Sequence, residues 1–134
     1  MRNIKATLLY RWFEEVWNKN SEAAIDDMMN EDTIPHDLIP PGEPLGAAGF
    51  KTFYRGFRSN FKDVNVVVRH VVSEDDMESA LTDVTAVHIP SGKEVRFSGI
   101  CTVRIKDGRI LEAWNHYDFL GMYQQLGFQL QEMK

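Results

Sequence analysis

The sequence predicts an α+β protein in which helices pack on one face of a curved antiparallel sheet. Before residue 61, apolar residues recur at helical spacing. From about residue 64 to residue 117, runs rich in β-branched residues alternate apolar and polar positions, as strands do. Between two of these runs lies Asp107-Gly108, a pair that favours a two-residue turn because both central residues need a positive φ. Together these features predict helices first and then a meander of four strands.

Composition indicates a single globular domain over residues 1–134, because a chain of this length with 43% hydrophobic residues can bury a core of its own. The net charge of −5 and the scattered basic residues argue against nucleic-acid binding, which needs clustered Lys and Arg. No apolar run approaches the ~20 residues of a membrane-spanning helix. A single cysteine, Cys101, excludes an internal disulfide and suits the reducing cytoplasm. We therefore expect a cytoplasmic protein that binds neither nucleic acid nor membrane.

Two helices and a long loop are predicted first. Apolar residues at every fourth position predict an amphipathic helix over residues 3–18. Ser21 is a suitable N-cap for a shorter helix that ends near residue 30. Four prolines and three glycines predict a loop over residues 33–49, with a short extended piece around residues 33–38. A loop of this length in a compact domain usually carries function.

A third helix, from about residue 47 to residue 60, carries an aromatic face. Its aromatic residues are Phe50, Phe53, Tyr54 and Phe57, and Phe61 follows at the same spacing. One interpretation is core packing. The other is that the rings form the floor of a pocket for a flat or apolar ligand, since ligand pockets are mostly apolar. In that case Tyr54 and Phe57 would contact the ligand.

The Asp-Gly turn sets a register for the last two strands. If Lys106 faces Arg109, a side-chain period of two predicts the pairs along the hairpin. These are Ile105 with Ile110, Val103 with Glu112, Cys101 with Trp114, Gly99 with His116 and Phe97 with Asp118. The register places Asp118 among Phe97, Cys101 and Trp114. A closing helix is predicted over about residues 120–126.

A carboxylate in such surroundings has two interpretations. Apolar neighbours such as Phe97 and Trp114 would desolvate Asp118 and make it a suitable general base. Alternatively, Asp118 is the N-cap of the closing helix, because Asp is a preferred capping residue.

A series of short motifs runs through nearly the whole chain. They are His36-Asp37, Gly49-Phe50, Tyr54-Arg55-Gly56, Ser91-Gly92-Lys93, Asp107-Gly108-Arg109-Ile110, Trp114, Asp118, Leu120-Gly121 and Gln125-Leu126-Gly127. Their order and spacing resemble the SnoaL-like polyketide (ester) cyclase family of the NTF2-like superfamily. The resemblance implies a cone-shaped, curved antiparallel sheet with helices on its concave face around an apolar cavity, commonly in a dimer formed through the outer sheet face.

The resemblance also implies a chemistry. In the cyclases of this family the aspartate that matches Asp118 is the acid/base, and the reaction is an intramolecular aldol closure of a polyketide ester that needs no cofactor. The ligand would be a small apolar or aromatic carbonyl compound. His88 is a second candidate, whose position depends on the turn before Lys93. A two-residue turn at Ser91-Gly92 places His88 on the face of Phe97 and Asp118, where it would contact a carbonyl, and a three-residue turn places it on the other face.

The remaining candidates for substrate binding are His36, Phe97, Trp114 and His116. His36 lies beside the Pro/Gly loop and either lines the mouth of the cavity or is a surface residue. The histidines and acidic residues show no spacing typical of a metal site, so we expect no metal and no cofactor.

Two classes of function compete. One is a cofactor-free cyclase or isomerase with Asp118 as acid/base, and the other is a protein that only binds a small molecule or dimerises. A homodimer is expected because one face of the predicted hairpin carries Ile100, Leu111, Ala113 and Tyr117.

Overall fold

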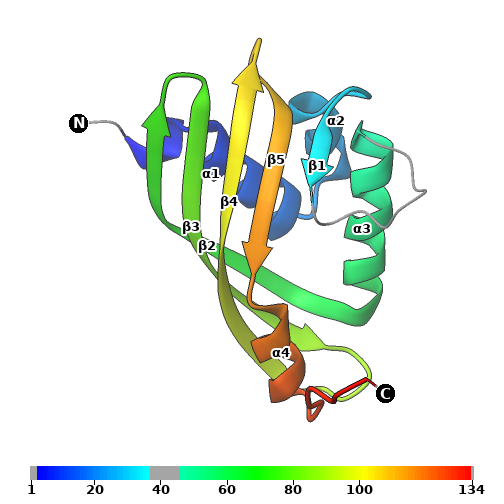
Figure 1. Ribbon diagram of the computed structural model, residues 1–134. Helices are drawn as coiled ribbons and strands as arrows, with labels where there is room; N and C mark the ends of the chain where they lie inside the picture. The colour runs from blue at the N-terminus through cyan, green and yellow to red at the C-terminus, as the bar shows by residue number, and fades with distance from the viewer. Residues whose placement is uncertain (1–2, 37–45, 134) are drawn as a thin grey trace.

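The computed structural model describes residues 3–36 and 46–133, and these form an α+β fold with a curved sheet (Figure 1). The helical elements are η1 (Ile4–Ala6), α1 (Leu8–Trp12), the π-helix η2 (Phe13–Asn18), α2 (Glu22–Met28), α3 (Gly46–Asn60) and α4 (Phe119–Gln125). The strands are β1 (Ile34–His36), β2 (Phe61–Glu74), β3 (Met77–His88), β4 (Glu94–Lys106) and β5 (Arg109–Tyr117). The predicted fold class is confirmed.

The strands form one sheet in the order β1-β5-β4-β3-β2. Strands β2 to β5 form the predicted antiparallel meander, whereas β1 pairs with β5 in parallel, from Ile34 beside Glu112 to His36 beside Trp114. The expectation of a purely antiparallel sheet is therefore wrong at this edge, and the sheet is mixed. The extended piece predicted around residues 33–38 corresponds to β1, and residues 37–45 of the predicted loop lie outside the described residues.

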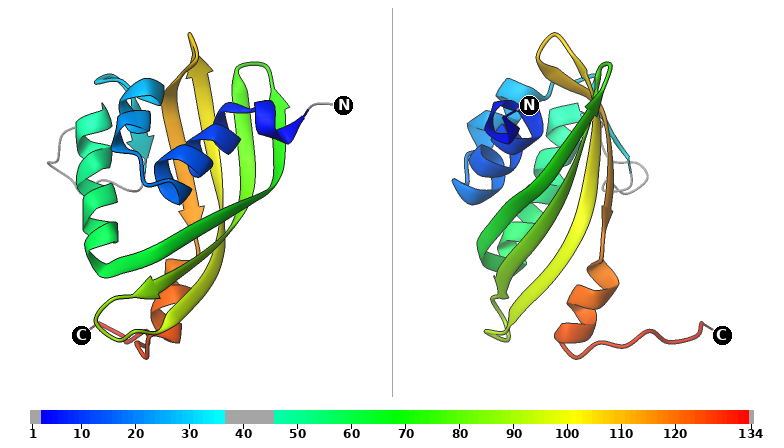
Figure 2. Two further views of the ribbon diagram at one scale, coloured as in Figure 1. Left: turned by 180° about the vertical axis from the view of Figure 1, so that it is seen from behind. Right: turned by 90° about the vertical axis from the view of Figure 1, so that its left-hand side faces the viewer.

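The helices from α1 to α3 cover one face of the sheet (Figure 2). Strands β2, β3 and β4 curve around this layer, so the helices lie on the concave side, as the resemblance to the family implies. Helix α4 instead follows the end of β5 and packs beside β4.

The helix predicted over residues 3–18 is divided into three segments. Thr7 caps α1, because its hydroxyl accepts a hydrogen bond from the Tyr10 amide at 3.2 Å. The carboxylate of Glu78, on β3, accepts two more from the amides of Leu8, at 3.3 Å, and Leu9, at 3.0 Å. Glu78 is only 5% exposed, so a buried acid on the sheet satisfies the start of the helix. The sequence analysis did not predict this contact.

Trp17 lies at the centre of the aromatic core. Four rings of α3 surround it, with centroid distances from 4.9 to 6.4 Å, from Phe50, Phe53, Tyr54 and Phe57. The hydroxyl of Tyr54 is buried and donates to the carbonyl of Val16 at 2.9 Å. The core-packing interpretation therefore applies to most of the aromatic face, and Tyr54 in particular joins α3 to η2.

Two side-chain amides occupy strand edges that lack a neighbouring strand. The amide of Asn18 binds both the N–H and the carbonyl of Val66 on β2, at 2.6 and 2.9 Å. The amide of Gln125 does the same for Arg96 on β4, at 2.8 and 2.7 Å, beyond the point where β5 ends. Each amide makes the backbone hydrogen bonds that an adjacent strand would otherwise make, and this protects an open edge of the sheet. Gln125 also fixes α4 against β4.

The hairpin between β4 and β5 begins in the predicted register. Asp107 and Gly108 have φ values of 54° and 75°, and Lys106 pairs with Arg109. Arg104, however, pairs with Glu112, so Leu111 is an extra residue that forms a β-bulge.

The bulge exchanges the two faces of β5 after Leu111. Cys101 pairs with Asn115, whereas Trp114 pairs with Thr102, so the predicted pair of Cys101 with Trp114 is wrong. Because side chains alternate, the inner face carries Ala113, Asn115 and Tyr117, and the outer face carries Glu112, Trp114 and His116. Both faces of this strand are half apolar, so the sequence pattern does not reveal the one-residue shift.

Candidate functional site

An apolar cavity of about 70 Å³ lies between the helical layer and the inner face of the sheet. Its helical wall is largely aromatic and consists of Trp12, Phe13, Trp17, Phe50, Phe53 and Phe57. Its sheet wall includes Phe97, Cys101, Val103, Ala113, Asn115 and Tyr117, and Phe119 of α4 completes this side. Such a wall suits a ligand that is mostly apolar.

The polar groups of the cavity lie on the sheet wall. Asn115 and Tyr117 project from the same face of β5, and the thiol of Cys101 projects from β4. The Tyr117 hydroxyl lies 3.1 Å from the hydroxyl of Thr82, a fully buried residue of β3. Burial raises the pKa of Tyr117 above its usual range, the nearby Cys101 adds to this effect, and the hydrogen bond with Thr82 opposes it. The phenol is therefore neutral at physiological pH and able to donate a hydrogen bond.

Burial in the cavity wall raises the pKa of the Cys101 thiol to about 12. In the unfolded chain a cysteine loses its proton near pH ~8.5. Between these values the folded state holds a proton that the unfolded state has released, so the free energy of unfolding falls as pH rises. We expect urea unfolding curves to show this loss of stability from about pH 9 upward. Cys101→Ala is expected to make the free energy of unfolding depend less steeply on pH in that range, and to leave its pH dependence unchanged below pH ~8. Parallel profiles for the two proteins would contradict a buried thiol.

Asp118 lies outside the cavity wall. It is exposed, its Oδ1 accepts a hydrogen bond from the amide of Gly121 at 2.9 Å, and its own amide donates to the carbonyl of Ser98 at 3.1 Å. This is the N-cap geometry for α4. The expectation that its carboxylate lies buried among Phe97, Cys101 and Trp114 is wrong, because the bulge shifts the end of β5 by one residue. A catalytic role for Asp118 stays a prediction.

Replacing the capping carboxylate separates the two interpretations of Asp118. We expect Asp118→Ala to lower the free energy of unfolding by about 1 kcal/mol and Asp118→Asn to change it little, because Asn also caps helices. Thermal or urea denaturation measures both, with Asp27→Ala, at an exposed position of α2, as the matched control. Unchanged stability in Asp118→Ala would contradict the capping role.

His88 lies at the end of β3, next to a connection that runs from Ile89 to Gly92. This connection is longer than either turn considered from the sequence, since the Gly92 amide donates to the His88 carbonyl and the His88 amide donates to the carbonyl of Lys93. By alternation from the pair of Val84 with Phe97, His88 is on the Phe97 side of the sheet. Its ring contacts Phe61 at 5.3 Å between centroids, and Nδ1 lies 2.7 Å from the Ser91 hydroxyl. It is not among the described residues that line the cavity.

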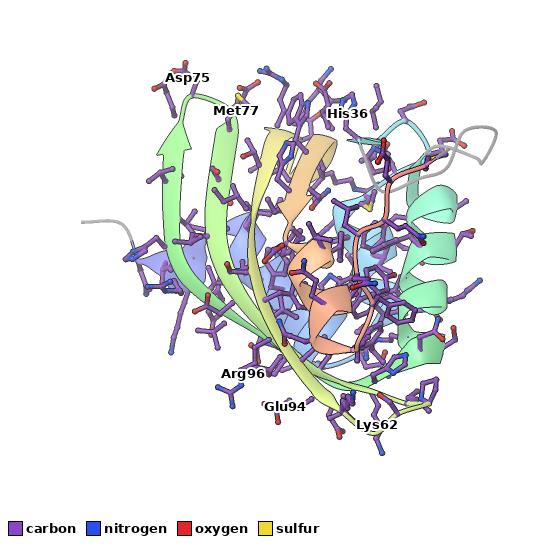
Figure 3. The ribbon with its side chains drawn as sticks, turned by 60° about the horizontal axis from the view of Figure 1, so that its bottom comes forward. His36, Lys62, Asp75, Met77, Glu94 and Arg96 are labelled. Carbon is purple, nitrogen blue, oxygen red and sulfur yellow. The ribbon has the colours of Figure 1, made fainter. Side chains whose placement is uncertain are left out.

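Three further candidates lie on the outer face of the sheet. His36 stacks on Trp114 with centroids 5.1 Å apart, and its Nε2 lies 2.8 Å from a carboxylate oxygen of Glu112. His116 is exposed on the same face. Figure 3 shows His36 at the opposite end of the molecule from Glu94 and Arg96, the end where Gln125 holds α4. His36, Trp114 and His116 are not among the described residues that line the cavity, and their role in substrate binding stays a prediction.

Of the predicted residues, Phe57 and Phe97 line the cavity, and Tyr54 packs behind it. The sequence analysis did not single out Asn115, Tyr117 or Thr82 as ligand contacts. Their position depends on the bulge and on the alignment of three strands, for which the sequence carries no local signal.

Among residues 3–36 and 46–133, no cluster of three or more His, Cys, Asp or Glu side chains is arranged to hold a metal ion. In the same part of the chain, none of the helices combines the length and the apolar character needed to cross a membrane.

Comparisons with known proteins agree with this architecture. The family model described as SnoaL-like polyketide cyclase matches residues 7–126. A candidate polyketide cyclase from Bacillus cereus is 30% identical, with a TM-score of 0.75 over 86% of this chain and 75% of that chain. Another, from Acidithiobacillus ferrooxidans, is 26% identical, with a TM-score of 0.78 over 94% and 98%. TsrD from Streptomyces laurentii shares the fold at 20% identity, with a TM-score of 0.79 over 90% and 92%. No curated protein matches.

The match covers most of the chain, so the protein belongs to the SnoaL-like polyketide cyclase family. The resemblance inferred from the motifs is confirmed, and the NTF2-like fold is shared with these structures.

Proposed function

We propose that the protein takes a small apolar carbonyl compound of polyketide type into the cavity and acts on it without a cofactor. The observation that carries this proposal is an apolar cavity whose polar groups, Asn115 and Tyr117, lie side by side on one strand. Family membership supports a carbonyl compound as the ligand class. The cavity, at about 70 Å³, is smaller than the ~300 Å³ of common ligand pockets, so a small ligand fits best unless the aromatic side chains move.

Ligand binding tests the proposal directly. Trp12 and Trp17 line the cavity, so their fluorescence is expected to change when a small aromatic ketone such as acetophenone enters. Ala113→Leu adds volume inside the cavity and is expected to abolish the change, whereas Ala48→Leu, at an exposed position of α3, is the matched control. If Ala113→Leu binds as well as wild type, the cavity is not the binding site.

A second candidate function is binding without turnover. It is favoured by one observation: the described residues of the cavity wall include no carboxylate and no imidazole, and enolisation needs a base. Exchange of the methyl protons of acetophenone in D₂O, followed by NMR, distinguishes the two. Acceleration that is lost in Asp118→Asn supports a cyclase-type enzyme with Asp118 as acid/base, and binding without acceleration supports the second candidate.

We also propose that a second copy of the chain covers the outer face of the sheet. The apolar set expected from the sequence needs correction, because Ala113 and Tyr117 line the cavity, while Ile100 is 45% exposed beside Leu81. Light scattering at micromolar concentration is expected to give a dimeric mass that Ile100→Asp halves. Ile89→Asp is the matched control, since Ile89 is 46% exposed outside the strands. A monomeric wild type would refute the dimer.

A further inference from the structure

Three residues lie in line across the middle of the sheet. Thr82 on β3 pairs with Gly99 on β4, and Gly99 pairs with Tyr117 on β5. An added Cβ at Gly99 would overlap the ring of Tyr117, so the absence of a side chain there lets the ring cross β4. The Tyr117 hydroxyl thereby comes within 3.1 Å of the Thr82 hydroxyl, two strands away.

The ring of Tyr117 is held in this position by its neighbours. Phe97 packs on it with centroids 6.3 Å apart, and Phe119 with centroids 6.0 Å apart. Both of these side chains also line the cavity. The ring of Tyr117 is therefore fixed at the cavity wall, which lowers the cost of ordering it when a ligand binds.

The two hydroxyls can share their protons in two ways. In the first, Thr82 donates to the Gly99 carbonyl, 3.3 Å from its oxygen, and Tyr117 donates to Thr82, which uses both protons. The distance to the Gly99 carbonyl is at the long end of the range for a hydroxyl, so the bond is weak. In the second, Thr82 turns its proton toward Tyr117, and the phenol proton becomes free to bind another oxygen. A phenol that stays neutral suits this role, because only the protonated form donates.

Asn115 provides a second polar point. It lies two residues before Tyr117 on the same face of β5, a spacing of about 7 Å along a strand. Its amide lines the cavity, and the described residues offer it no side-chain hydrogen bond. An amide facing an otherwise apolar wall is costly unless a ligand or water completes its hydrogen bonds.

We propose that Tyr117, supported by Thr82, receives the carbonyl oxygen of the ligand, and that Asn115 binds a second oxygen of the same molecule. This assignment rests on the proposed function and narrows it to apolar compounds with two separated oxygens, such as diketones. In an enzyme, donation from Tyr117 would stabilise the negative charge that develops on the carbonyl oxygen during enolisation.

Two probes test the assignment, acetophenone with one carbonyl and 1,3-diacetylbenzene with two. Tyr117→Phe is expected to bind acetophenone about five- to tenfold more weakly, the effect of one lost hydrogen bond. In infrared difference spectra, the carbonyl stretching frequency of acetophenone bound to wild type is expected to be that of a hydrogen-bonded ketone. In Tyr117→Phe it is expected to move toward the frequency that acetophenone has in hexane. Tyr123→Phe makes the same change at an exposed tyrosine of α4 and is expected neither to weaken acetophenone binding nor to shift the carbonyl stretch.

Two further variants keep the test decisive. Thr82→Val is expected to shift the carbonyl stretch in the same direction as Tyr117→Phe, but by less. This variant therefore tests the assignment if Tyr117→Phe folds poorly. Asn115→Leu is expected to weaken 1,3-diacetylbenzene but not acetophenone. Equal affinity and an equal stretch in wild type, Tyr117→Phe and Thr82→Val would overturn the assignment while leaving the cavity as the binding site. Failure of wild type to bind either probe would overturn the proposed function as well.

Discussion

Gly99→Ala is expected to lower the free energy of unfolding by about 3 kcal/mol, the upper range for forcing an extra methyl group into a packed site. The new Cβ would overlap the ring of Tyr117 and lie 2.6 Å from the carbonyl of His116. Neither neighbour can give way easily, because one is backbone and the other is held between Phe97 and Phe119. Urea denaturation of the purified variant measures the loss.

The matched control is Gly56→Ala. Gly56 lies inside α3, and an added Cβ there meets no atom within 4 Å. Alanine is favoured over glycine inside a helix by roughly 1 kcal/mol, so this variant is expected to be as stable as wild type or more so. Equal effects of the two substitutions would contradict the close approach of Tyr117 to β4, and with it the alignment of Thr82, Gly99 and Tyr117.

Glu78→Ala is expected to cost a similar amount, about 3 kcal/mol. The carboxylate is the acceptor for the amides of Leu8 and Leu9 at the start of α1, and the site is buried. Without it, helix donors lose their partner where water has little access, and hydrogen bonds to a charged group are worth about 1.5–3 kcal/mol each. Differential scanning calorimetry and urea denaturation both report the change.

Glu94→Ala is the control for Glu78→Ala. Glu94 also lies in a strand, but its side chain is 54% exposed and its ion pair is with Arg96, on the same strand. Exposed pairs of this kind contribute little, so the expected loss is within about 0.5 kcal/mol. If Glu78→Ala is no worse than Glu94→Ala, the buried carboxylate does not support the helix in the way described.

Local sequence signals predicted much of this fold. The order of helices and strands, the turn at Asp107-Gly108 and the aromatic face of α3 each depend on spacing within a few residues. Asp118 illustrates the limit of such signals. The residues around Asp118 are enough to predict that it is the N-cap of α4. Whether its carboxylate is buried depends instead on the pairing register of β4 with β5, which is set about ten residues earlier.

The features of the fold and of the cavity that the sequence did not predict depend on pairing register or on contacts between distant parts of the chain. The bulge at Leu111 could not be predicted, because both faces of β5 are half apolar and a shift of one residue leaves the pattern acceptable. The parallel pairing of β1 with β5 and the contact of Glu78 with α1 join residues that are about 70 to 80 positions apart in the sequence. The same holds for the cavity, where Tyr117 reaches Thr82 only because Gly99 lies between them.

The central claim is that the cavity between the helical layer and the inner face of the sheet binds the ligand. A crystal structure with 4′-bromoacetophenone tests it most directly, because anomalous scattering locates the bromine. We predict a bromine between α3 and β5, with the ketone oxygen within hydrogen-bonding distance of the Tyr117 hydroxyl. A bromine beside Asp118, beside His88 or on the outer face beside Trp114, with the cavity empty, would contradict the account.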